Sequence, residues 1–277
     1  MRAFAELCEA VSRTTKKTIK VGLVSAYFHD QTVEQAALSA LFLSGKVFPA
    51  HTETTLQVGG SLIWQALEKI TTRPAATMNA AYRRYGDLGS AAAELLALQP
   101  EPSASLTLVS VEETFLQLAN ARGQAGRLTL IEQLLRRATA IEAKYLIKIM
   151  TGDLRIGLRE SLVEEAIAAA YGEDPAMVRR ANMLLGDISQ TLRLAAEHRL
   201  AEARMRLFHP VAMMLASPVE TTDEAAKYFE QALVEDKYDG IRAQAHIGLA
   251  DEQPRIFSRT LDDVTNSFPE LAHALQR

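Results

Sequence analysis

The stretch EDKYDGIRAQAHIG, residues 235–248, decides the fold expected for the carboxy-terminal part of this chain. Lys237 stands two residues before an Asp-Gly pair, and Arg242 follows just beyond it. Residues 243–247 alternate between apolar and polar side chains, which is typical of a β-strand with one buried face. An Asp-Gly pair favours a tight turn, because glycine accepts the backbone angles that the turn requires. Taken alone, the stretch is explained by an ordinary β-hairpin with an exposed lysine beside its turn.

Composition bounds what the chain can be. Its 277 residues are 48% hydrophobic and 23% charged, which is ordinary for a globular protein and long enough for two domains. The single cysteine, Cys8, excludes an intramolecular disulfide and a cysteine zinc cluster and favours a reducing, intracellular compartment. The longest apolar runs are far shorter than the roughly 20 residues that cross a bilayer, so we expect no membrane association.

Helical periodicity dominates the first 206 residues, where leucine and alanine recur at helical spacing and Gly, Pro or Asn mark the breaks. One predicted helix covers residues 109–121 and has Ser110 as its N-cap. No internal repeat is evident. The net charge of residues 1–206 is +2, whereas residues 207–277 carry −6. We expect an all-α domain over residues 1–206.

The sequence pattern changes after residue 206. Pro210 and Pro218 fall in an apolar connector there, and prolines disfavour a helix. The pattern beyond it predicts a helix over 221–233, strands over 243–247 and 254–260, and a helix over 262–277 capped by Asp262 or Asp263. The fold class is therefore mainly α. An all-α domain, 1–206, precedes the beginning of an α+β domain, 207–277.

The residues around Lys237 include further features that a β-hairpin does not explain. Glu235 precedes it by two residues, and FSRTLDDVTNSFPEL, residues 257–271, follows after a short spacer. Together these resemble motif I of the covalent nucleotidyltransferases, E-x-K-x-D-G-x-R, followed by the F-S-R segment of the ATP-dependent DNA ligases. The upstream sequence is similar to the helical DNA-binding domain of that family in TLQVGGSLIWQALEKIT (55–71), YGDLGSAA (85–92), LTLVSVEETFLQLA (106–119) and EAKYLIKIMTGDLRIGLRESLVEEAIAAAYG (142–172).

The resemblance implies that Lys237 is the catalytic nucleophile. A lysine amine attacks only when neutral, and its reference pKa of about 10.4 has to be lowered by desolvation and nearby cations. The family's reaction uses ATP and Mg²⁺ to form a lysyl-AMP, passes AMP to the 5′-phosphate at a nick, and seals the strand when the 3′-hydroxyl attacks. No Walker P-loop occurs, so ATP use here is expected to be of this covalent kind.

The same resemblance assigns the residues around the lysine to ATP. Glu235 is expected to contact the adenine amino group and Arg242 the ribose region, while Arg259 meets nucleotide or DNA-end phosphate. Asp239 and Gly240 are expected to build the turn that aims the lysine. The alternative for both arginines is a solvated position at a strand edge.

The segment GDLRIGLRE, residues 152–160, is the strongest candidate for DNA contact. Gly152 and Gly157 flank Arg155 and let the backbone approach a surface closely, and the amino terminus of the next helix, near Arg159, suits a phosphate. The alternative is a turn between two helices in which glycine is only the C-cap.

Lys144 and Lys148 share one helical face upstream of this segment and are further candidates for DNA contact. We expect contacts to the backbone and minor groove that follow duplex shape, with no base code, because no recognition cluster of Asn, Gln or Arg is identifiable. The family resemblance implies that the partner is nicked double-stranded DNA, and we expect a monomer. A helix-turn-helix reader is the alternative.

The histidines show no metal-ligand spacing, so no metal-binding residue is predicted. The resemblance implies that the later nucleotidyltransferase motifs and an OB-fold lie beyond residue 277, so we expect an amino-terminal portion that cannot seal nicks alone. Other classes stay open: a non-catalytic DNA-binding module with a vestigial adenylation segment, and a capping enzyme or RNA ligase. NAD⁺ dependence is disfavoured because NAD⁺-using ligases carry a different amino-terminal region.

Overall fold

The computed structural model describes residues 1–52, 54–100, 102, 106–211, 217–248 and 252–276. The chain forms two compact units, Met1–Arg204 and Met205–Arg277. The described residues are mainly helical, and their strands belong to the second unit, which confirms the predicted fold class. No helix in the described part of the chain combines the length and apolarity needed to span a membrane.

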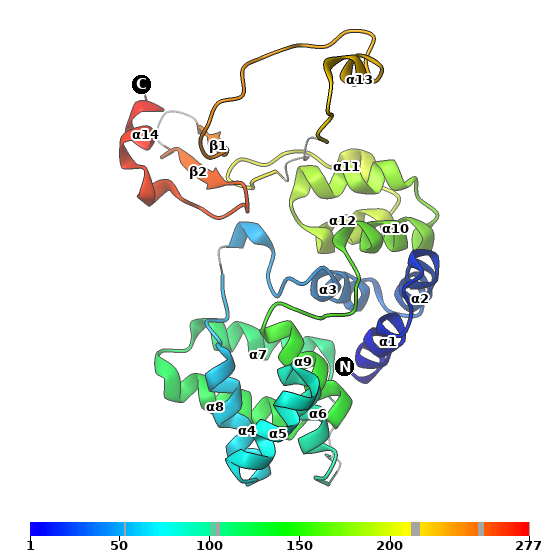
Figure 1. Cartoon of the computed structure of the whole chain (residues 1–277), viewed down its shortest axis with the longest axis vertical. Helices are drawn as coiled ribbons and strands as arrows, with labels where there is room; N and C mark the ends of the chain where they lie inside the picture. Colours follow the sequence, from blue (N-terminus) through cyan, green and yellow to red (C-terminus); the bar gives the residue numbers. More distant parts are fainter. Residues whose placement is uncertain (53, 101, 103–105, 212–216, 249–251, 277) are drawn as a thin grey trace. The chain divides into compact units, whose positions relative to one another are not determined.

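Twelve α-helices build the described part of the first unit (Figure 1). They are α1 (Arg2–Ser12), α2 (Lys17–His29), α3 (Val33–Leu43), α4 (Gly60–Thr71), α5 (Ala75–Tyr85), α6 (Leu88–Leu96), α7 (Leu108–Asn120), α8 (Gly123–Arg136), α9 (Ala140–Met150), α10 (Glu160–Tyr171), α11 (Pro175–Leu185) and α12 (Ile188–Ala196). Short 3₁₀ turns occur at Ala50–Thr52 and Leu200–Glu202.

Side-chain caps fix where several helices begin. The predicted cap of α7 was wrong: Thr107 is the N-cap, and Ser110 is the third helical residue. The Thr107 hydroxyl accepts from the Ser110 amide, and the Ser110 hydroxyl accepts from the Thr107 amide, so the two form a capping box. A serine can stand either at the N-cap or at the third helical position of a capping box, so the sequence alone does not decide which of the two Ser110 occupies.

The twelve helices form two copies of one six-helix pattern. Thr32 caps α3 and Thr139 caps α9, each in a capping box, and the two positions are 107 residues apart. Gly45 after α3 and Gly152 after α9 have the same separation and both have positive φ. α1 and α2 match α7 and α8 at nearly this separation.

The second half of the pattern recurs at a separation of 100 residues. α4, α5 and α6 correspond to α10, α11 and α12, with matching bounds. Gly86 and Gly186 end α5 and α11 in the left-handed conformation, and Asp87 and Asp187 cap the helices that follow. The expectation of no internal repeat was therefore wrong. A difference of seven residues before α4 and α10 breaks the period, and few side chains are identical, so inspection of the sequence missed the duplication.

The two copies exchange their second halves. α2 packs on α10 and α3 on α12, whereas α8 packs on α4 and α9 on α6. Lobe A therefore consists of α1–α3 with α10–α12, and lobe B consists of α4–α9 (Figure 1). α1 contacts α9 and α3 contacts α7, which joins the lobes.

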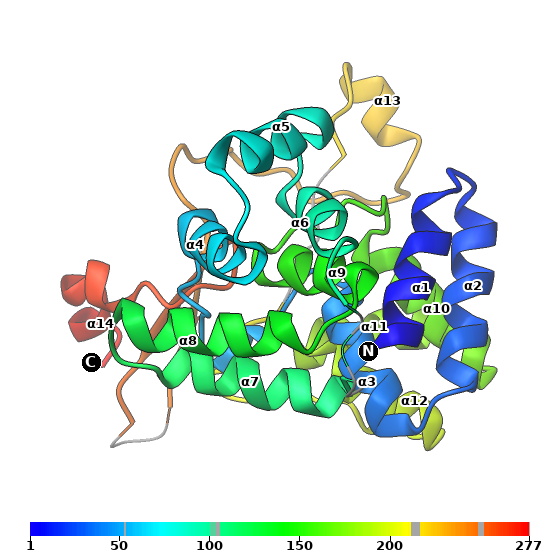
Figure 2. The ribbon, with the colours of Figure 1, turned by 90° about the horizontal axis from the view of Figure 1, so that it is seen from below.

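Close approach of α6 and α9 holds lobe B together (Figure 2). A Cβ built on Gly89 of α6 would lie 2.5 Å from the Lys144 carbonyl oxygen on α9, so only glycine fits there. Around this contact the core is apolar and closely packed, with Phe115, Leu146 and Leu95 almost fully buried. The fold therefore places α9, and the segment that follows it, in a fixed position.

The second unit contains a two-stranded antiparallel ribbon, β1 (Ala243–His246) and β2 (Arg255–Ser258). Both strands were predicted. The helix expected over 221–233 is only α13 (Thr222–Ala226), because it buries none of its side chains and a short helix without packing is unstable.

The carboxy-terminal helix also begins later than the sequence indicates. α14 (Pro269–Ala274) has Phe268 at its N-cap. The prediction that Asp262 or Asp263 caps it was wrong. Instead, Asp263 accepts from the Thr265 amide at 2.8 Å, just before a 3₁₀ turn, Thr265–Ser267, whose N-cap residue is Val264. An aspartate preceding a turn and one preceding a helix look alike in sequence.

The segment before Val211 is fixed to the ribbon by β1. The Phe208 amide donates to His246 Nδ1 at 3.0 Å, and the Val211 amide donates to Gln244 Oε1 at 3.0 Å. The Arg255 guanidinium lies over the Phe208 ring, 4.9 Å from its centroid. Most of the apolar connector predicted between the prolines, residues 212–216, lies outside the described residues.

Candidate functional site

The ribbon brings the two predicted nucleotide-binding arginines to one end of the sheet. Ala243 pairs with Ser258 in the register of β1 and β2. Arg242 immediately precedes β1 and Arg259 immediately follows β2, so both lie at the same end of the ribbon. Both are exposed.

A network of side chains shapes the turn that carries Arg259. The Ser258 amide donates to the Asp262 carbonyl at 2.9 Å, and the Thr260 and Asp262 amides both donate to the Ser258 hydroxyl at 3.2 Å. Leu261 adopts a positive φ of 72° within this turn. The serine of the F-S-R segment therefore shapes the turn, and the arginine is left to face solvent.

The segment with the proposed nucleophile is exposed. Lys237, Glu235 and their neighbours from 231 to 240 all have exposed side chains, and residues 232–239 have no regular secondary structure. The expected tight turn at Asp239 and Gly240 is absent. A hairpin turn requires a strand on each side, and in this described segment no strand precedes β1. Lys237 lies five residues before Arg242 in the chain, in the segment that leads into β1.

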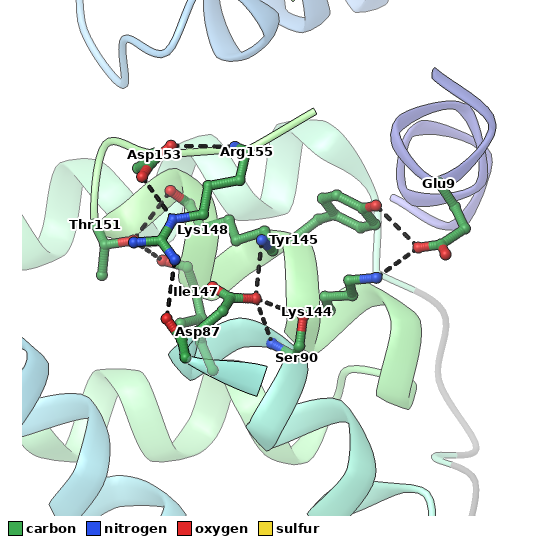
Figure 3. Close-up of polar contacts among 11 residues, drawn as sticks. Glu9, Asp87, Ser90, Lys144, Tyr145, Ile147, Lys148, Thr151, Asp153 and Arg155 are labelled. Carbon is green, nitrogen blue, oxygen red and sulfur yellow. Dashed lines mark hydrogen bonds and ion pairs between the residues drawn. The ribbon is translucent and has the colours of Figure 1, made fainter. Parts of the chain in front are cut away.

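In the first unit, the predicted DNA-contact residues lie in the turn between α9 and α10. Gly152, Arg155 and Gly157 adopt positive φ of 72°, 51° and 60°. Arg155 Nε donates to Asp153 Oδ2 at 2.8 Å, and its Nη1 donates to the Gly86 carbonyl at 2.9 Å (Figure 3). Asp153 raises the pKa of the Arg155 guanidinium further above its ordinary value, so the exposed side chain carries a fixed positive charge.

Arg159 is exposed and is the N-cap residue of α10, where no side chain caps the first turn. The amide groups at such a helix end favour an anion. Arg155 also lines a hollow of about 560 Å³ with Gly60 and Ser61, the first residues of α4. The turn before α10 and the start of α4 therefore face the same hollow, whose walls include Trp64 and Tyr82.

Lys144 and Lys148 have partners inside the fold (Figure 3). Lys144 Nζ lies 2.7 Å from Glu9 Oε2, and Lys148 Nζ lies 2.9 Å from Asp87 Oδ2. Lys148 is only 5% exposed. Their shared face packs against α1 and α6, which the periodicity alone did not reveal. A DNA contact from the turn therefore has to rest on the arginines and the glycine backbone.

The sequence did not predict the carboxylates of these pairs, Asp87 and Glu9. Burial alone would raise the pKa of Asp87, but hydrogen bonds from Ser90 and Lys148 outweigh it and lower the pKa below its ordinary value. Glu9 behaves in the same way, with Lys144 and Tyr145 as donors, and its pKa is also lowered. The Gly-Asp pair between two predicted helices was the available signal for Asp87.

Comparison with known proteins places both units. Residues 1–168 match the family model described as DNA ligase N terminus, and residues 213–277 match that of the ATP dependent DNA ligase domain. The whole chain is 57% identical to a probable DNA ligase of Koribacter versatilis, covering 48% of that protein. It is 31% identical over 99% of its length to a DNA ligase of Archaeoglobus fulgidus, covering 51% of it.

A helical unit followed by a K-x-D-G segment and a two-stranded ribbon is the arrangement expected of a nucleotidyltransferase-type protein with a helical amino-terminal domain. The chain belongs to the ATP-dependent DNA ligase family. It spans about half the length of the two relatives just named.

Proposed function

We propose that the whole protein is an ATP-dependent DNA ligase that seals nicks in duplex DNA, with Lys237 as its nucleophile. The observation that carries the proposal is the placement of Arg242 and Arg259 at one end of the ribbon, next to the segment of Lys237, within the part that matches the ligase domain. Two exposed guanidinium groups at one end of a ribbon suit a nucleotide phosphate or ribose.

In the proposed reaction, Lys237 Nζ loses a proton to solvent and attacks the α-phosphorus of ATP. A P–N bond forms, the bond to the bridging oxygen breaks, and pyrophosphate leaves. A 5′-phosphate oxygen at the nick then attacks the same phosphorus, the P–N bond breaks, and the lysine nitrogen leaves as it takes up a proton from solvent. Finally, the 3′-hydroxyl loses its proton to solvent and attacks the 5′-phosphorus, which forms the phosphodiester, breaks the bond to the AMP oxygen and expels AMP.

Glu235, as a carboxylate acceptor, suits the adenine amino group. Mg²⁺ would accompany the nucleotide through its phosphate oxygens and screen their charge. Among the described residues, no three His, Cys, Asp or Glu side chains form a group able to hold a metal. We therefore assign no residue to the metal, and none of the steps above is routed through it.

We propose that the helical unit holds the duplex through the turn 152–159. Arg155 and Arg159 are exposed, and the positive φ of Gly152 and Gly157 lets the backbone approach a phosphate. Such contacts carry no base code, which suits an enzyme that must act at any sequence. Lys144 and Lys148 support the surface from within through their carboxylate partners.

Covalent labelling tests the catalytic proposal. The full-length protein, given α-labelled ATP and Mg²⁺, is expected to acquire an acid-labile AMP adduct that Lys237→Ala abolishes. Lys227→Ala is the matched control, because Lys227 is an exposed lysine of the same unit outside the motif. Labelling that survives Lys237→Ala would refute the assignment of the nucleophile.

We further propose that residues 1–277 alone do not seal nicks, because a nucleophilic lysine needs desolvation and Lys237 is exposed here. A measurable ligation rate from these residues alone would contradict this. The alternative function is a non-catalytic DNA-binding module, which predicts duplex binding without any adduct in the full-length protein.

A further inference from the structure

We infer that Lys20 and Arg127 are positioning residues that fix the two turns bordering the proposed DNA surface. The inference rests on the proposed DNA binding of the helical unit. Each cation comes from the second helix of one copy of the duplicated pattern. Each reaches the turn that precedes a helix of the other copy.

Lys20 lies on α2 and is only 5% exposed. Its ammonium group donates to the carbonyl oxygen of Ile156 at 2.5 Å and to that of Gly157 at 2.8 Å. Among the described residues, no carboxylate lies within ion-pair distance of this amine. Burial lowers the pKa of Lys20, as expected for a cation whose partners are neutral carbonyls. A buried cation is costly, so its retention at a turn calls for a use.

Gly157 is shaped for this contact. Its φ of +60° disfavours any side chain, and a Cβ at this position would lie 2.7 Å from Lys20 Nζ. The turn and the amine are therefore matched: the glycine leaves room, and the lysine draws the carbonyls of 156 and 157 inward. With the carbonyls turned inward, Arg155 remains exposed on the outer side of the turn.

An equivalent hydrogen bond from the second helix to the turn occurs in the other copy, with a different donor and acceptor. Arg127 on α8 is 107 residues after Lys20, and its Nη2 donates to Gln57 Oε1 at 2.7 Å. Gln57 is 100 residues before Gly157 and also has a positive φ, 49°. Two equivalent positions thus hold two equivalent turns through unrelated donor and acceptor groups. That recurrence favours a selected role over a chance contact.

The two turns lead to the start of α4 and of α10, which contain the groups proposed to meet DNA. Gly60 at the start of α4 and Arg155 line one hollow, so both turns border the same surface. A turn that is already fixed does not have to be ordered when DNA binds, so binding loses less conformational entropy. Lys20 and Arg127 should therefore strengthen DNA binding without contacting phosphate themselves.

Salt dependence separates positioning from direct contact. Binding of a nicked duplex to the full chain is measured over a range of salt concentrations for Lys20→Met, Arg155→Ala and Lys17→Met. Each phosphate contact contributes about 0.9 to the slope of log affinity against log salt. Arg155→Ala should lower the slope by about that amount, whereas Lys20→Met should weaken binding about tenfold with an unchanged slope. Lys17→Met, an exposed lysine of the same helix, should change little.

Amide hydrogen exchange supplies a readout that is independent of DNA. Lys20→Met should accelerate exchange over residues 154–158 while the interior of α10 stays protected. Gln57→Ala provides a second variant, in the turn before α4. It removes the acceptor of the Arg127 hydrogen bond at an exposed position and buries no new group. This variant should also weaken DNA binding while the slope of log affinity against log salt stays unchanged.

The outcomes separate the two proposals. If the wild-type chain does not bind duplex at low salt, the proposed function fails and the inference falls with it. If the wild type binds and both Lys20→Met and Gln57→Ala bind equally well, the function stands and the positioning role is refuted. A lowered salt slope for Lys20→Met would make it a direct contact and would also overturn the inference.

Discussion

At the scale of single residues, the ion pair of Asp87 and Lys148 shows how a charge that looks exposed in sequence becomes internal. Lys148 is 5% exposed, and its amine lies 2.9 Å from Asp87 Oδ2. Asp87 also caps α6 by accepting from the Ser90 amide at 2.9 Å. One carboxylate thus satisfies a helix end and a buried cation, so the cost of removing it exceeds that of a surface pair.

Asp87→Asn should lower the free energy of unfolding by about 3 kcal/mol at neutral pH, because Lys148 is left buried without a charged partner. The folded pKa of Asp87 lies below its unfolded value. Its stabilisation is therefore complete above the unfolded pKa of about 3.9 and is lost as the pH falls through the lower folded pKa. Urea unfolding at several pH values checks both statements.

The control for this prediction is Glu6→Gln, which breaks an exposed pair with Arg2 and should cost at most about 0.5 kcal/mol. If Asp87→Asn destabilises no more than this control, the buried pair contributes nothing beyond a surface pair. A wild-type advantage that persists unchanged at pH 2 would contradict the assigned pKa direction.

At the scale of elements, glycines within helices have opposite effects on stability according to the atoms that surround them. Gly89 faces the backbone of α9, where an added Cβ would meet a carbonyl oxygen at 2.5 Å. Gly126 in α8 has no atom within 4 Å of an added Cβ. Helix propensity alone treats both as weak points. The packing of α6 on α9 makes the first indispensable.

Gly89→Ala should therefore lower the free energy of unfolding by about 1–3 kcal/mol, because backbone has to move to admit the methyl group. Gly126→Ala should raise it by up to about 1 kcal/mol through helix propensity. Thermal or urea unfolding of the two variants compares them directly. Equal effects of the same sign would show that α6 and α9 are not held at the observed distance.

At the scale of the whole molecule, the first unit is a duplicated six-helix pattern whose copies exchange halves. α4 and α6 pack on α8 and α9, and α10 and α12 pack on α2 and α3. Neither copy encloses its own core. The first copy, residues 1–106, should therefore be unable to fold alone, although it contains six helices.

This topology is testable by dividing the unit. Peptides 1–106 and 107–204 should each show little helical circular dichroism and no cooperative unfolding, and mixing them should restore both. The undivided chain 1–204 is the control and should unfold cooperatively. A separate 1–106 that is helical and unfolds cooperatively would contradict the exchanged arrangement.

The sequence by itself determined the motif of Lys237, the mainly helical class, the strands β1 and β2, and the start of α10 near residue 160. These depend on local periodicity, turn residues and a short motif, all of which are readable along the chain. Only the tertiary structure decided that Lys148 is internal, that Arg242 and Arg259 lie at the same end of the ribbon, and that α1–α6 recur as α7–α12. Those facts depend on how elements that are separated in sequence pack or pair with one another, and local patterns do not encode such pairings.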